Sequence, residues 1–151
     1  MEKQNVENPL LMSEFIPYPL ALRLKALGFK ERVLTYFEDD KIKLHDHISG
    51  WDFNSSFLNC VSRPTYSQAF RWFRDHHNIE CTPTAVVQAE KKWYNTSLIY
   101  NQDIINDYTL IETYEEAELA CLTKLIEIKE ERHQEEWDLY LKQKEDGKDH
   151  I

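Results

Sequence analysis

The stretch Thr113-Tyr114-Glu115-Glu116-Ala117-Glu118-Leu119-Ala120-Cys121-Leu122 decides the fold, because it predicts where the last helix begins and which face it buries. Thr113 followed three residues later by Glu116 is a capping box, in which each side chain bonds a backbone N–H at the start of a helix. Apolar residues then recur at helical spacing, at Ala117, Cys121, Leu125 and Ile128. We therefore predict a long amphipathic helix that begins after Thr113 and carries no arrangement of catalytic residue types.

Beyond Ile128 the sequence becomes highly charged, and a second apolar stripe replaces the first. At 3.6 residues per turn this stripe comprises Leu122, Ile126, Trp137, Tyr140 and Leu141. Such a stripe suits a two-helix seam, although Arg132 and His133 interrupt it. We predict a single domain over residues 1–128 and a charged helical extension over residues 129–151 with a disordered end. A homodimer through this helix is one hypothesis.

Two shorter helices and several strands are predicted upstream. Proline in the first turn and glycine just past the end predict a helix between Pro19 and Gly28. Thr65 and Gln68 form a second capping box, and their helix is expected to stop at Asn78. Strand-like runs occupy residues 32–37, 41–45, 84–89, 93–100 and 108–111.

The segment 46–63 has no clear periodicity and is predicted to be a turn-rich loop. Pro83 is expected only at the beginning of its strand, because proline cannot donate to a ladder. Together these elements predict a single α+β fold, with a small antiparallel sheet, helices packed on one of its faces and a long C-terminal helix.

Composition excludes some classes of function. The chain has 151 residues, of which 42% are hydrophobic and 13% aromatic, so it is expected to fold. Its formal charge is −9, from 27 acidic and 18 basic side chains. A nucleic-acid binder needs clustered Lys and Arg, so nucleic acid is an unlikely partner. Acidic mimicry of nucleic acid is disfavoured by mixed signs such as Lys129-Glu130-Glu131-Arg132.

The cysteines and the chain start indicate the cytoplasm. Cys60, Cys81 and Cys121 are odd in number and lack a Cys-x-x-Cys pair, which is typical of reduced thiols. Residues 1–8 are polar and do not resemble a signal peptide. No apolar run is long enough to span a membrane, so we expect no membrane partner.

Catalytic and metal sites have little support in the sequence. His45, His47, His76 and His77 are the best candidates for a metal, but His76 and His77 point about 100° apart on a helix, so exposed histidines are the preferred interpretation. The three glycines are too far apart for a phosphate-binding loop. We predict no catalytic residue, no metal and no cofactor.

A mixture of aromatic and cationic side chains predicts a surface for a partner. Its members are Trp51, Phe53, Arg71, Trp72, Arg74, Lys91 and Trp93. One hypothesis is a protein partner of unknown identity. The alternative is a small nucleotide-like ligand held between Arg71, Arg74 and Trp93, since guanidinium groups and rings bind phosphates and bases.

Three blocks carry a resemblance to a known family, namely residues 18–29 (YPLALRLKALGF), 66–74 (YSQAFRWFR) and 113–126 (TYEEAELACLTKLI). In this order they resemble a family of small uncharacterised proteins from bacteriophages and mobile elements of Bacteroides-type gut bacteria. The resemblance implies phage or prophage accessory biology in a bacterial host cell. The family has no assigned activity, so the resemblance indicates neither a reaction nor functional residues. We therefore expect a non-enzymatic accessory protein that acts by protein–protein interaction and modulates the host.

Overall fold

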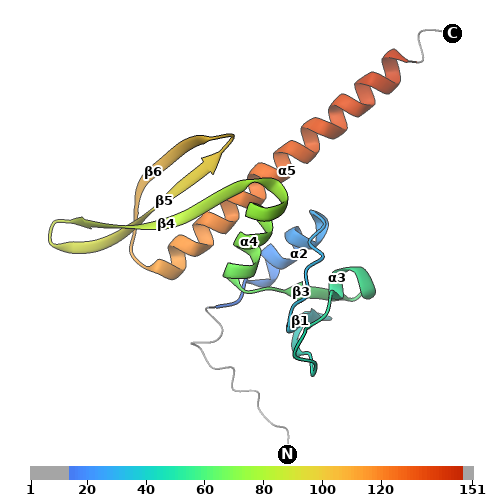
Figure 1. The fold of residues 1–151 in the computed structure, drawn as a ribbon, viewed down its shortest axis with the longest axis horizontal. Helices are drawn as coiled ribbons and strands as arrows, with labels where there is room; N and C mark the ends of the chain where they lie inside the picture. Colours follow the sequence, from blue (N-terminus) through green and yellow to red (C-terminus); the bar gives the residue numbers. More distant parts are fainter. Residues whose placement is uncertain (1–13, 148–151) are drawn as a thin grey trace, which may run out of the picture.

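The computed structural model describes residues 14–147. The elements of this part follow the order (Figure 1) α2 Tyr18–Ala26, β1 Thr35–Glu38, β2 Lys41–Leu44, α3 Phe53–Ser56, β3 Cys60–Arg63, α4 Tyr66–His77, β4 Ile79–Gln88, β5 Lys91–Tyr100, β6 Asp103–Ile111 and α5 Tyr114–Asp146. The predicted α+β class, with antiparallel strands and a long C-terminal helix, is confirmed. The predictions for residues 1–8 and for a disordered end at 148–151 lie outside the described residues.

The helix ends follow the signals read from the sequence. At the start of α4 both bonds of the capping box form between Thr65 and Gln68, and Asn78 ends the helix in the left-handed conformation. At the start of α5 the Thr113 hydroxyl accepts a hydrogen bond from the Glu116 N–H at 3.2 Å, which is one of the two bonds of the predicted capping box. These caps satisfy backbone donors that the first helical turn leaves without partners.

The strands form two three-stranded antiparallel sheets, with orders β2-β1-β3 and β4-β5-β6. One small sheet was predicted, and several other details also differ. Helix α3 was not predicted, and β6 begins at Asp103 and not at Tyr108. Strand β3 lies inside the segment 46–63 that was predicted to be a loop, because all four of its residues are buried and no alternation marks it. Pro83 lies within β4 and not at its beginning. Strand β4 pairs only with β5, so its other edge tolerates the missing N–H.

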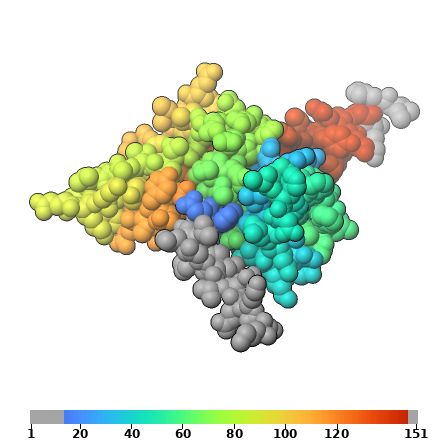
Figure 2. Space-filling model, turned by 60° about the horizontal axis from the view of Figure 1, so that its bottom comes forward, coloured from blue at the N-terminus to red at the C-terminus, as the bar shows by residue number. Residues whose placement is uncertain are grey.

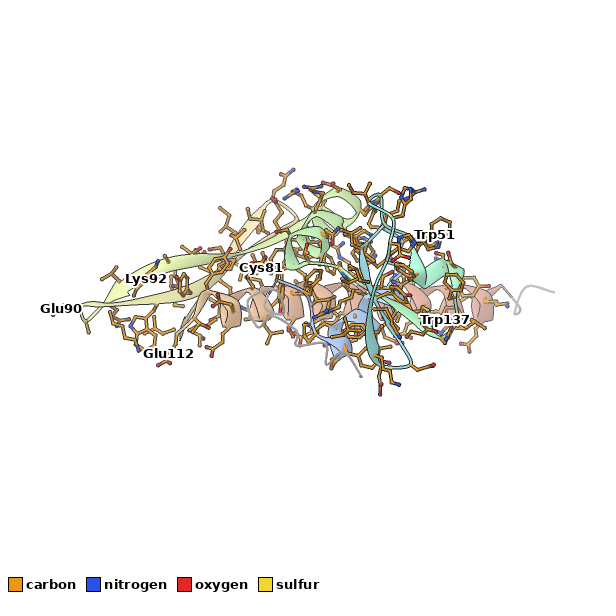
Figure 3. The ribbon with its side chains drawn as sticks, turned by 90° about the horizontal axis from the view of Figure 1, so that it is seen from below. Trp51, Cys81, Glu90, Lys92, Glu112 and Trp137 are labelled. Atoms are coloured by element: carbon orange, nitrogen blue, oxygen red, sulfur yellow. The ribbon has the colours of Figure 1, made fainter. Side chains whose placement is uncertain are left out.

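Helix α5 holds the β4-β5-β6 sheet together with helices α2 and α4. Its first turns pack along one face of the β4-β5-β6 sheet and also contact α2 and α4 (Figures 1 and 3). Residues from both sheets and from the helices belong to one hydrophobic core, in which Cys121, Leu125 and Phe73 are fully buried. The boundary proposed at residue 128 stays a prediction.

A polar contact also fixes α5 to the sheet. The Lys124 ammonium donates hydrogen bonds to the Thr96 hydroxyl and the Asp107 carboxylate, each at 2.7 Å. The bond from Lys124 and the Thr109 N–H hold the pKa of Asp107 well below its usual range. This contact sets which sheet residues face α5 and which face away.

Two glycines offer a matched test of the fold. Gly50 and Gly28 both have positive φ, at 67° and 93°. A Cβ on Gly50 would lie 2.6 Å from the Val33 carbonyl oxygen, whereas a Cβ on Gly28 would meet nothing within 4 Å. We expect Gly50→Ala to lower the free energy of unfolding by more than about 2 kcal/mol, and Gly28→Ala by only about 1 kcal/mol. Urea denaturation measures both; equal losses would contradict the packing around Val33.

Candidate interaction surfaces

The structure divides the predicted aromatic and cationic cluster. Phe53 and Trp72 lie in the core with exposed fractions of 3% and 5%. Phe53 stacks on Tyr36 with ring centroids 3.9 Å apart, and Trp72 packs edge-on against Phe29. Both rings stabilise the fold, so they are not part of the partner surface that was predicted.

The other members of the cluster lie in separate places. Trp51 stacks on His45 and donates from its indole N–H to the Ser56 hydroxyl at 2.8 Å. Lys91 and Trp93 lie near the tip of the β4–β5 hairpin, where the Lys91 ammonium is 4.0 Å from the centroid of the Trp93 ring. Figure 3 places Trp51 and the hairpin tip at opposite ends of the molecule. One continuous surface is therefore not formed.

Arg71 and Arg74 line a cleft of about 420 Å³ between α4, the edge of β4 and the start of α5. Acidic groups share this cleft. The Arg74 guanidinium lies 3.9 Å from the Glu80 carboxylate, and burial together with nearby Glu14 and Glu115 raises the pKa of Glu118. Trp93 does not line the cleft. Arg71, Arg74 and Trp93 therefore do not form the single small-ligand site that was predicted.

Another candidate surface is the face of the β4-β5-β6 sheet that points away from α5, called here the outer face. Side chains alternate along a strand, and Tyr94, Thr96 and Leu98 point towards α5. The outer face is consequently formed by Thr82, Thr84, Val86, Trp93, Asn95, Ser97, Ile99, Ile104 and Asn106. Figure 3 shows the sheet from its edge, with α5 along one side.

The outer face combines hydrogen-bonding and apolar groups across its three strands. The Ser97 hydroxyl donates to the Asn106 side-chain oxygen at 2.7 Å and lies 3.4 Å from the Thr84 hydroxyl. Ile99 and Ile104 form a cross-strand pair beside this polar row, and both are exposed. A surface of this composition can offer apolar contact and hydrogen bonds to another protein.

Only part of the apolar stripe that was predicted for self-association is exposed on α5. Leu122 and Ile126 are fully buried in the core of the same chain, so they are not available to another molecule. Trp137, Tyr140 and Leu141 are exposed on the part of α5 that extends beyond the body (Figure 2). Self-association stays a prediction, and its surface is reduced to these three residues and their neighbours.

The histidines are arranged as two local pairs. The ring of His45 accepts from the His47 backbone N–H at 3.1 Å, and the ring of His47 lies 2.6 Å from the Ser49 hydroxyl. His76 contacts the Glu31 carboxylate at 2.8 Å, and His77 packs against Trp72. Between residues 14 and 147, no group of three His, Cys, Asp or Glu side chains is placed to hold a metal ion.

The three cysteines are free thiols and all are buried. Cys81 on β4 and Cys121 on α5 are hydrogen-bonded partners, and this bond together with burial raises the pKa of Cys121. A neutral buried thiol is a poor nucleophile. Cys121 therefore acts as a core residue, as its place on the predicted stripe indicated.

No protein-family model, curated protein or solved structure matches the chain. In the part of the chain from residue 14 to 147, every helix is either too short or too polar to cross a bilayer.

The half-buried ring of His77 predicts a pH dependence of stability. Burial and the charges of Lys129, His76, Arg132 and His133 lower its pKa from 6.5 to about 4. As pH falls through this interval the unfolded chain binds a proton that the folded chain does not, so the free energy of unfolding declines. We expect His77→Phe, which keeps the ring but cannot titrate, to decline less in urea titrations at a series of pH values. A decline equal to that of the parent would contradict this role.

Proposed function

We propose that the protein is a non-enzymatic accessory protein of a bacteriophage or mobile element, which binds a host protein through the outer face in the bacterial cytoplasm. The origin is supported by the resemblance of residues 18–29, 66–74 and 113–126 to proteins of such elements. The compartment is supported by three buried free thiols. A net charge of −9 makes a protein a better candidate partner than nucleic acid.

The observation that carries the proposal is the exposure of the outer face on a rigid support. Ile99 and Ile104 are 42% and 68% exposed, and they pair directly across β5 and β6 near the turn that joins these strands. The opposite face is packed on α5 and held there by the bonds of Lys124 to Thr96 and Asp107. An ordered surface loses little conformational entropy when it binds. Exposed apolar groups next to hydrogen-bonding groups are typical of protein-binding surfaces.

The small-ligand alternative has weaker support. The cleft that holds Arg71 and Arg74 also holds Glu80 and Glu118, whose negative charges would oppose a phosphate. The Trp93 ring is instead covered by the Lys91 ammonium on the hairpin. The described residues therefore support the binding of a protein partner better than the binding of a small ligand.

The outer face can be tested with two matched substitutions in one sheet. Ile104→Ser removes an exposed side chain of the outer face, and Val87→Ser removes one that is 76% exposed on the opposite face, where α5 does not cover it. We expect a host protein captured from a Bacteroides-type lysate by the parent chain to bind Ile104→Ser about tenfold more weakly, because one exposed apolar contact is lost. Titration calorimetry with the purified host protein gives the two dissociation constants.

Val87→Ser is the control and should bind as the parent does. Circular dichroism and urea denaturation of both variants establish that each sheet remains folded. Equal affinity of all three proteins would reject the outer face as the binding surface, and native mass spectrometry that found a small molecule in place of a host protein would favour the ligand alternative.

A further inference from the structure

The last part of α5 extends beyond the contacts that hold the helix to the body. Arg132 donates from its guanidinium to the Tyr100 hydroxyl at 2.8 Å. From residue 133 to the helix end at Asp146, the described chain forms only local side-chain bonds, such as Gln134 to Asp138 at 2.8 Å. Fourteen helical residues span about 21 Å, and an isolated helix of about this length is marginal in water. The extension therefore gains stability if something packs on it.

One face of this extension has a definite chemical order, and we call it the tip face. Glu130, Trp137 and Lys144 are spaced by seven residues each, which places them above one another along a helix. Tyr140 and Leu141 flank the line between Trp137 and Lys144. The rings of Trp137 and Tyr140 stack with centroids 5.6 Å apart. The tip face thus has an acid at its beginning, an apolar centre and a base at its end.

A groove lies beside the acidic end of the tip face. It has a volume of about 590 Å³ and is lined by Ala26 and Leu27 of the α2 end together with Glu130, His133, Gln134, Glu136 and Trp137. The lining mixes apolar atoms with two carboxylates. This composition suits a lysine side chain, which combines an apolar stem with a positive head. It also suits a leucine next to a lysine.

We propose that the tip face binds a second copy of this chain in an antiparallel arrangement with Trp137 at the two-fold axis. Because Trp137 is midway between Glu130 and Lys144, this alignment sets Lys144 of each copy level with Glu130 of the other. Leu141 of each copy then lies level with His133 of the other and enters the groove beside Leu27. The same groove and the same tip are used twice, which closes the assembly at two chains.

Charge decides the direction of the pair. A parallel arrangement would set Lys144 against Lys144 and Glu130 against Glu130, and like charges at such positions repel. The Glu130 carboxylate accepts from Arg23 Nε of its own chain at 3.1 Å and remains 40% exposed. A carboxylate has room for further donors, so Glu130 can also accept from a second lysine. This pairing leaves the outer face free and does not depend on the proposed function.

Sedimentation velocity of the full chain over a range of concentrations tests the pairing. We expect a dimer of two 18.1 kDa chains for the parent. Trp137→Ala and Lys144→Glu should each raise the dimer dissociation constant at least about tenfold, the first by removing the central contact and the second by opposing two carboxylates. In a parallel pair Lys144→Glu would exchange one repulsion for another and change little, which would overturn the antiparallel assignment.

Each variant has a matched control on the other side of the same helix. Leu139 is 56% exposed, as is Trp137, but helical geometry places it on the opposite side, so Leu139→Ala should dimerise as the parent does. Lys142→Glu makes the same change of charge near the helix end as Lys144→Glu but lies away from the tip face, and it should also dimerise normally. A monomeric parent at all concentrations, or equal loss in variants and controls, would overturn the proposal. Circular dichroism of each variant separates a lost contact from a melted helix.

Discussion

The rest of the structure depends on the burial of the first half of α5. Leu122, Leu125 and Ile126 have no exposed surface, and the residues around them come from the β4-β5-β6 sheet on one side and from α2 and α4 on the other. Complete burial of three such side chains contributes roughly 5 to 9 kcal/mol, a large share of the stability of a domain of this size. Without this helix the β4-β5-β6 sheet would lose the core that covers one of its faces.

The same packing also positions both proposed surfaces. Because α5 lies against the inner face of the sheet, the outer face is left to solvent; because α5 continues as one helix from Tyr114 to Asp146, the tip face is carried away from the body. Lys124 strengthens this arrangement with its bonds to Thr96 and Asp107. The packing of α5 against the sheet means that binding at the outer face requires little ordering of the chain, whereas the end of α5 gains stability when a partner covers it.

Local chemistry in the sequence predicted the helix boundaries well, since capping and glycine signals act within a few residues. Strand β3 was missed because four buried residues carry no alternation, and Pro83 was misplaced because edge position in a sheet is a tertiary property. Among the site residues, Trp72 and Phe53 have the composition of a binding surface but are core rings. Leu122, Ile126 and Trp137 do share a helix face. Periodicity does not predict at which residue this face becomes exposed to solvent. That residue is set by the last tertiary contacts of α5, which are made with α2 and Tyr100.

An antiparallel dimer would give the outer face a property that a single chain lacks. The two-fold axis at Trp137 lies towards one end of the molecule, and the β4–β5 hairpin extends from the other end (Figures 2 and 3). The two outer faces of a dimer would therefore be separated and free at the same time. A host protein that is itself multimeric would then meet two sites held at a fixed spacing, and the second contact would form at a high effective concentration. Weak contacts at each exposed sheet would in this way suffice for tight association, which is consistent with a surface that presents a small exposed apolar pair, Ile99 and Ile104, and not one deep pocket.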